Sequence, residues 1–173
     1  MTIDLFHDTV CPWCRIGKAN LRRALREWSG EPVDLRYHAF FLNPDIPEEG
    51  ADFASYMNAK GGGNVPLEQW FARPREMGAK AGLEFNFEKI TRAPNSRLSH
   101  ELIFLAPEDR REALIDAIYT AYFVEGRDIG SIDTLCDIAG DLGMDRDDAR
   151  AALASGRMRE QVATDISEAQ ELG

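Results

Sequence analysis

The sequence predicts an α/β protein in which a strand, a helix and a second strand precede a long helical region. Residues 2–6 alternate polar and apolar side chains, which is typical of a half-buried strand. Residues 33–41 are rich in strand-forming side chains and indicate a second strand. After Pro94 the apolar residues recur at helical spacing. Two strands joined by a helix favour a right-handed parallel βαβ unit.

The helix of this unit is expected to begin at Pro12 and to end near Gly30. Proline suits the first position of a helix, where its missing N–H would be unpaired in any case. The segment has apolar residues at helical spacing, and we expect its basic residues on the opposite face. The apolar positions are Leu21, Ala24, Leu25 and Trp28, and the basic ones are Lys18, Arg22, Arg23 and Arg26. This start places Cys11 at the N-cap.

Beyond the second strand the sequence changes character. A loop over residues 42–47 interrupts the pattern, and a weak helix (51–60), a flexible glycine-rich loop (61–64), a helix (66–77) and a short extended piece (83–87) are expected next. Five further helices are expected at residues 95–106, 107–124, 131–142, 146–154 and 157–172, separated by glycines. We therefore interpret residues 1–46 as the βαβ unit and residues 47–173 as a helical body that packs over it.

The composition is that of an ordinary globular protein with an acidic surface. The 173 residues are 44% hydrophobic, and 30 acidic against 20 basic residues give a formal net charge of −10. This charge disfavours nucleic acids and anionic membranes as partners. Strand residues begin almost at Met1 and no apolar run has the length of a membrane span, so we expect a cytoplasmic protein. Three cysteines are too few for a secreted disulfide framework.

The segment Cys11-Pro12-Trp13-Cys14 carries the clearest chemistry. A sulfur at the N-cap meets the unpaired amides and the positive end of the helix dipole, and both favour thiolate over thiol. We expect Cys11 to lie exposed with a lowered pKa, and Cys14, one turn later, to be more shielded. Cys11 would then be the nucleophile and Cys14 the resolving thiol of a redox pair. Trp13, between them, either contacts substrate with its aromatic face or is a partly buried packing residue.

Two other roles are open to a Cys-x-x-Cys pair. A structural zinc site needs four cysteine or histidine ligands. The remaining candidates lack finger-like spacing, so no metal is expected; they are Cys136, His7, His38 and His100. Two buried, inert cysteines are the second alternative, which a proline-led helix start disfavours. Cys136 is expected in the core, His38 as a packed or edge residue, and His7 as a surface residue at a strand end or, less favoured, as a stabiliser of the Cys11 thiolate.

Several segments together resemble the DsbA-like branch of the thioredoxin superfamily, and within it the FrnE-type proteins. The matching segments are residues 8–14 with 16–18, 41–44, 94–96 with His100, and 121–123 with 125–130. The resemblance implies a thioredoxin-like βαβ start with a large α-helical insertion between the second and third strands. It also implies thiol-disulfide exchange at the two cysteines, with Pro12 and Trp13 between them tuning the redox potential. It also places Asn95, His100 and Asn43 near the substrate groove, although Asn95 equally suits a helix cap.

In this family a Gly-Val-Pro segment, two antiparallel strands and a final helix follow a helix like the one expected here at 157–172. They are expected to be missing from the present chain, which would leave a sheet edge open to association.

Three functions are consistent with these sequence features. The first is a thiol-disulfide oxidoreductase acting on protein or small-molecule disulfides or dithiols. The second is a glutathione-dependent isomerase or transferase, similar to the related 2-hydroxychromene-2-carboxylate isomerases and kappa-class glutathione transferases. The third is a redox-inert scaffold. No bound cofactor is expected, and glutathione would serve as a co-substrate.

Overall fold

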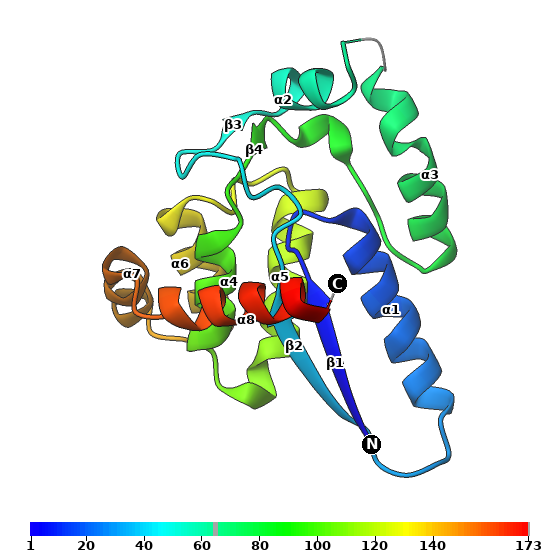
Figure 1. Cartoon of the computed structure of the whole chain (residues 1–173), viewed down its shortest axis with the longest axis vertical. Helices are drawn as coiled ribbons and strands as arrows, with labels where there is room; N and C mark the ends of the chain where they lie inside the picture. The colour runs from blue at the N-terminus through cyan, green and yellow to red at the C-terminus, as the bar shows by residue number, and fades with distance from the viewer. Residues whose placement is uncertain (64–65, 173) are drawn as a thin grey trace.

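The amino-terminal βαβ unit is present as expected (Figure 1). The computed structural model describes residues 1–63 and 66–172. Strand β1 (Thr2–His7), helix α1 (Pro12–Glu27) and strand β2 (Asp34–Ala39) follow one another in the chain. The two strands run parallel, in a register that pairs Thr2 with Asp34 and His7 with Ala39. Within the described residues they form a two-stranded sheet.

The rest of the chain is mostly helical, so the α/β architecture with a helical insertion is confirmed. Its elements are β3 (Ala51–Asp52), α2 (Phe53–Lys60), α3 (Leu67–Lys80), a 3-10 turn (Phe87–Lys89), β4 (Arg92–Ala93), α4 (Arg97–Leu105), α5 (Glu108–Phe123), α6 (Ile132–Asp141), α7 (Arg146–Ser155) and α8 (Arg159–Leu172). No helix in this described part of the chain has the length and apolar character needed to cross a bilayer.

The structure differs from the sequence expectation between residues 51 and 93. Strands β3 and β4 form a short antiparallel pair that the sequence did not predict. The expected helix at 51–60 begins two residues later, because the Asp52 side chain caps it by accepting from the backbone N–H of Ser55 at 2.8 Å. Residues 83–86, all described, form no strand, and Phe87 begins the 3-10 turn. Of the expected flexible loop, residues 61–63 form a turn, while Asn64 lies outside the described residues.

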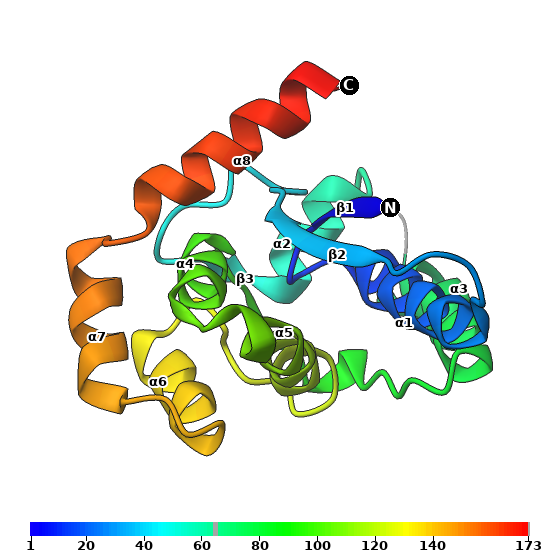
Figure 2. The same ribbon diagram turned by 90° about the horizontal axis from the view of Figure 1, so that it is seen from below.

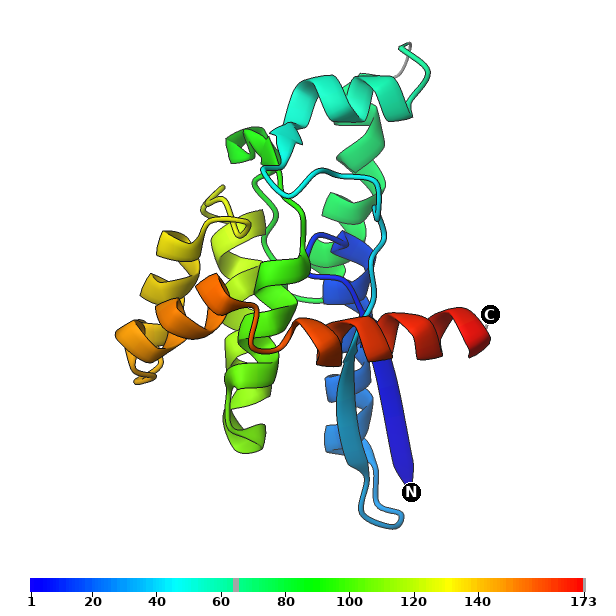
Figure 3. The same cartoon turned by 60° about the vertical axis from the view of Figure 1, so that its left-hand side comes forward.

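The elements surround the small sheet on several sides. Helix α8 crosses the sheet near the carboxyl ends of its strands, while α2 and α3 lie beyond those ends (Figures 1 and 3). Helices α4 and α5 lie beside the sheet, and α6 and α7 lie further out, beyond α4 (Figure 2). The Asp165 carboxylate fastens α8 to the sheet by accepting from the backbone N–H of Ala39 at 2.8 Å.

A buried cation, predicted on the basic face of the helix, links α1 to α5. Lys18 is only 4% exposed. Its ammonium lies 2.6 Å from Asp116 and 3.5 Å from Glu112, both on α5. Lys18 was expected on the face opposite the apolar residues. On that face Asp116 and Glu112 of α5 pair its charge, which allows the ammonium to be buried.

The core is centred on α5 and joins the helical region to the βαβ unit. Residues of α5 that are fully buried include Leu114, Ile115, Ile118 and Tyr119. A stack of phenylalanine rings extends from this centre to α3 and α2, with centroid separations of 5.1, 4.1 and 5.7 Å along Phe85, Phe87, Phe71 and Phe53. Aromatic pairs at these distances add to the stabilisation from burial alone.

Replacing Leu114 tests this view of the core. Leu114 is 0% exposed, whereas Leu172 is 70% exposed. Leu114→Ala is expected to lower the free energy of unfolding by about 2–5 kcal/mol, because it removes buried methyl groups and leaves a cavity. The matched Leu172→Ala change is expected to stay within about 0.5 kcal/mol. Urea unfolding followed by circular dichroism measures both, and equal effects of the two substitutions would contradict this assignment of the core.

Candidate active site

Cys11 occupies the N-cap of helix α1, as the sequence predicted. Its backbone is extended, with φ −97° and ψ 112°, and Pro12 is the first helical residue. The backbone N–H of Cys11 donates to the carbonyl of Asp8 at 3.1 Å, which closes the loop between β1 and α1. This geometry directs the first turn of the helix, with its unpaired amides, towards the sulfur of Cys11.

The accessibility of the two cysteines is the reverse of the expectation. Cys11 is only 7% exposed, and Cys14 is half-buried. The expected exposed position of Cys11 is wrong because α2, α3 and the loop after β2 close over the helix start and form a cavity that Cys11 lines. A nucleophile at this position is reached through that cavity.

The two thiols differ strongly in their pKa values. The pKa of Cys11 is lowered to about 7, first by side-chain hydrogen bonding with Cys14 and then by the backbone N–H groups of Cys14 and Trp13. Burial and the negative charge of Asp8 oppose this effect. The pKa of Cys14 is raised, because its thiol hydrogen-bonds to Cys11 and because it is partly buried. Both thiols are free, and the negative charge of the pair therefore resides on Cys11.

A buried polar cluster that the sequence did not reveal lies behind the cysteine loop. Its members come from three elements. The Asp8 carboxylate accepts from the backbone N–H groups of Val10 at 3.3 Å and Leu42 at 2.6 Å, so it joins the loop after β1 to the loop after β2. The Tyr119 hydroxyl, from α5, donates to the carbonyl of Asp8 at 3.3 Å. Both Asp8 and Tyr119 are 0% exposed.

His7 belongs to this cluster and is not the surface residue that was expected. It is 2% exposed because α5 and α4 cover the end of β1, and its Nδ1 lies 3.0 Å from the Tyr119 hydroxyl. Burial, and then the nearby His100 and Lys18, keep the pKa of His7 well below its usual range. His7 is therefore neutral near pH 7, so it does not supply the positive charge that would stabilise a thiolate.

The residues that the resemblance places near the groove are in different surroundings. Asn43 lines the cavity and accepts from the Lys60 ammonium at 2.5 Å. Asn95 instead donates to the carbonyl of Ile46 at 2.7 Å and accepts from the backbone N–H of Arg97 at 3.0 Å. His100 is 1% exposed, with Nε2 3.6 Å from the Asp8 carboxylate. Neither Asn95 nor His100 is among the described residues that line the cavity.

The cavity beside Cys11 is aromatic and has a volume of about 230 Å³. The side chains that line it come from both the βαβ unit and the helical region. Among the described lining residues none is acidic, and Lys60 alone is basic. The lining residues are Val10, Cys11, Pro12, Trp13, Leu42, Asn43, Ile46, Phe53, Tyr56, Met57, Lys60, Trp70, Phe71, Pro74, Phe87, Ile90, Ala93, Pro94, Tyr122 and Phe123. Trp13 is 46% exposed and Leu42 is 44% exposed, so both also present apolar surface to solvent. An aromatic cavity in a chain of net charge −10 is suited to an apolar group next to the reactive sulfur.

Cys136 lies in helix α6, apart from the cavity, and is 2% exposed. It belongs to the hydrophobic core, as expected from its apolar neighbours in sequence. Burial raises the pKa of its thiol. Cys136 is therefore a buried, un-ionised thiol at neutral pH.

Solved structures share this fold. A probable DsbA oxidoreductase, SCO1869 of Streptomyces coelicolor, superposes with a TM-score of 0.89 at 29% identity, over 100% of this chain and 76% of its own. The cytosolic disulfide reductase DsbM of Pseudomonas aeruginosa, solved with GSH, has a TM-score of 0.68 at 21% identity, over 100% of this chain and 81% of its own. A 2-hydroxychromene-2-carboxylate isomerase has a TM-score of 0.69 at 17% identity, over 99% and 80%. At the two lower identities the likeness concerns the fold.

Sequence comparison agrees with this likeness. The uncharacterized protein YwbO of Bacillus subtilis is 29% identical over 154 residues, which are 87% of this chain and 70% of YwbO. The family model of the DSBA-like thioredoxin domain matches residues 2–173. The chain therefore belongs to the DsbA-like thioredoxin-domain family, which confirms the resemblance found in its sequence.

Proposed function

We propose that this chain is a thiol-disulfide oxidoreductase in which Cys11 attacks and Cys14 resolves. The Cys11 thiolate attacks one sulfur of a substrate disulfide, the disulfide bond breaks, and the other sulfur leaves as a thiolate that takes a proton from water. Cys14 then loses its proton and its sulfur attacks Cys11. The second substrate thiol is released and a Cys11–Cys14 disulfide remains, so the substrate gains two electrons and the protein loses them. The reverse sequence oxidises a dithiol.

The unequal pKa values of the two thiols carry this proposal. A pKa of about 7 makes Cys11 roughly half ionised at neutral pH, and a thiolate is the form that attacks a disulfide. The raised pKa of Cys14 keeps its thiol protonated while Cys11 is a thiolate. Formation of the mixed disulfide consumes the Cys11 thiolate, which is the main cause of the raised pKa, so Cys14 can then lose its proton. This difference separates the roles of nucleophile and resolving thiol within one turn of helix.

The cavity supports a second candidate function, a glutathione-dependent isomerase or transferase. Its aromatic side chains and its single basic residue among those described suit an apolar group with negative charge. Glutathione is then the partner thiol in either function, as the neighbouring structure of DsbM with GSH suggests. Mass spectrometry after mild oxidation distinguishes the two. Loss of two hydrogens indicates an internal disulfide, whereas a stable glutathione adduct at Cys11 indicates the second function.

We further infer a reducing compartment, the cytoplasm, as the place of action. Three cysteines are too few for a secreted disulfide framework, and the related DsbM is described as cytosolic.

The pH dependence of Cys11 reactivity tests the electrostatic part of this proposal. Since the pKa of Cys11 is lowered to about 7, its alkylation rate should rise about tenfold per pH unit well below pH 7 and level off above about pH 8. Cys14→Ala removes the main cause of the lowered pKa, so it should move the midpoint to higher pH. Iodoacetamide labelling with mass-spectrometric assignment to Cys11 measures both curves. A wild-type midpoint above pH 8.5, or no movement in Cys14→Ala, would contradict the assigned cause.

Cysteine substitutions test the assigned roles. Cys11→Ser should reduce insulin-disulfide reduction to below about 1% of the wild-type rate, because the attacking thiolate is lost. Cys14→Ser should retain the first attack and accumulate a mixed disulfide with the substrate, visible on non-reducing gels. Cys136→Ser is the control and should keep wild-type activity, since Cys136 lies in the core. Activity retained in Cys11→Ser would remove the proposal.

A further inference from the structure

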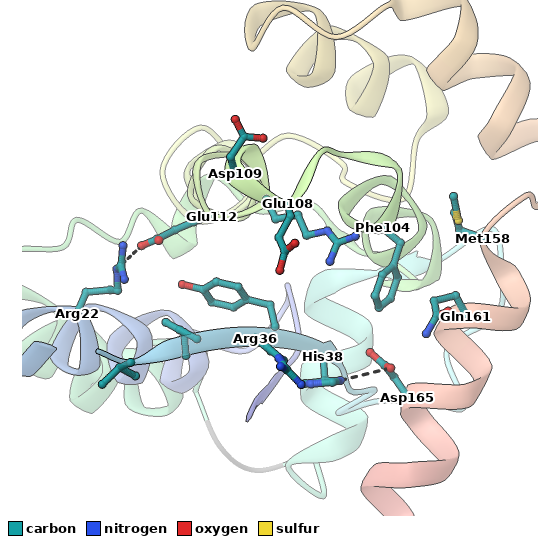
Figure 4. A pocket seen from close by; sticks show the side chains of 14 residues that line it. Arg22, Arg36, His38, Phe104, Glu108, Asp109, Glu112, Met158, Gln161 and Asp165 are labelled. Atoms are coloured by element: carbon teal, nitrogen blue, oxygen red, sulfur yellow. Dashed lines mark ion pairs between the residues drawn. The ribbon is translucent and has the colours of Figure 1, made fainter. Parts of the chain in front are cut away.

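A second cluster of reactive side chains lies where α8 crosses β2, and its residues are not among those that line the Cys11 cavity. His38 of β2 faces Asp165 of α8 across the end of a separate pocket (Figure 4). Glu168 follows Asp165 by three residues, which places both carboxylates on the same side of the helix. One ligand atom from each of these three side chains lies within 4.8 Å of the others.

A carboxylate on the other side of His38 determines the tautomer of its neutral ring. Nε2 of His38 lies 3.0 Å from Oδ1 of Asp4 on β1. A carboxylate at neutral pH can only accept, so Nε2 carries the hydrogen and, in the neutral ring, Nδ1 carries a lone pair. A carboxylate that accepts from one ring nitrogen while the other nitrogen is left free is the usual second shell of a metal-binding histidine.

The free nitrogen of His38 points at another acceptor. Nδ1 is buried, lacks a hydrogen-bond partner among the described residues, and lies 3.4 Å from Oδ1 of Asp165. The other oxygen of Asp165 accepts from the backbone N–H of Ala39, which fixes the direction of that carboxylate. At this distance a neutral Nδ1 and the carboxylate oxygen repel, so a positive charge, either a proton on Nδ1 or a metal ion, stabilises the pair.

The spacing suits a metal ion as that charge. Bonds of about 2.0–2.1 Å to a tetrahedral zinc ion place two ligand atoms about 3.3 Å apart. We propose that His38 Nδ1 and the carboxylates of Asp165 and Glu168 bind one Zn²⁺, with water in the fourth position. The Glu168 carboxylate lies within 4.8 Å of the ligand atoms of His38 and Asp165, and because this side chain is exposed it can rotate to bring its oxygen to the ion. The ion would fasten α8 to the sheet, alongside the hydrogen bond from Ala39 to Asp165.

The surrounding charges favour a cation. The chain has a net charge of −10, and Asp4, Asp165 and Glu168 are all acidic. Arg36 is the basic residue on the same side of β2, two residues before His38, and its guanidinium pairs with Asp34 at 2.8 Å.

Spacing along the sequence does not indicate this site, because its ligands come from residue 38 and from residues 165 and 168, more than 120 positions later.

Calorimetric titration with zinc chloride tests the proposal. Thiolates also bind zinc, so the full chain carrying Cys11→Ser and Cys14→Ser is the background for all measurements. One equivalent of Zn²⁺ should bind to this background and should raise its Tm. Co²⁺ should bind at the same place with a visible spectrum that lacks sulfur-to-metal charge-transfer bands.

Single substitutions in that background decide whether these residues are the ligands. Glu168→Gln and His38→Gln should each weaken zinc binding at least tenfold, and Asp4→Asn, which alters only the second shell, should weaken it about 10–100-fold. Glu168 is exposed, so Glu168→Gln should leave the far-ultraviolet circular dichroism spectrum unchanged. Glu160→Gln, on the same helix two turns away, is the charge-matched control and should change the affinity less than twofold. Absence of binding in the background protein, or affinity unchanged in both Glu168→Gln and His38→Gln, would overturn the proposal.

Discussion

The chemistry of the site depends on the pairing of the Cys11 and Cys14 thiols at the start of α1, because the Cys14 side chain is the largest cause of the lowered pKa of Cys11. Pro12 fixes where the helix starts and so places Cys11 at the N-cap, where the backbone N–H groups of Cys14 and Trp13 also lower the pKa of its thiol. The helix can keep this position because the buried ammonium of Lys18 ties it to α5. The βαβ unit therefore supplies the reactive group, while the helical region fixes its orientation and encloses it.

Local rules were sufficient to predict the start of α1 and the position of Cys11. Proline at the first helical position and a cysteine just before it are interpretable without tertiary information. The lowered pKa of Cys11 was predicted for the same reason, although its largest cause, the side chain of Cys14, depends on the folded position of that thiol. The helices after Pro94 were also predicted, and glycines mark the ends of most of them.

Burial could not be predicted, because it depends on which distant segment covers a residue. His7, Lys18 and Cys11 are polar or reactive residues at positions where the sequence favours exposure, and α5 or the α2–α3 region covers each of them. Strands β3 and β4 have two residues each, which is too short to leave an alternating pattern. The role of Asp8 in joining two loops depends on a contact with Leu42, 34 residues away, and nothing in the local sequence signals it.

The stack of phenylalanine rings has a consequence for how such proteins diverge. Phe53, Phe71 and Phe87 face the cavity beside Cys11 and also belong to, or pack against, the hydrophobic core. A mutation that enlarges or reshapes the cavity at these positions therefore also disturbs the core. Changes at Trp13, Leu42 or Lys60, at the margin of the cavity, avoid this coupling. Substitutions that alter substrate preference should accordingly concentrate at the margin of the cavity, while the phenylalanines of the stack should be substituted more slowly.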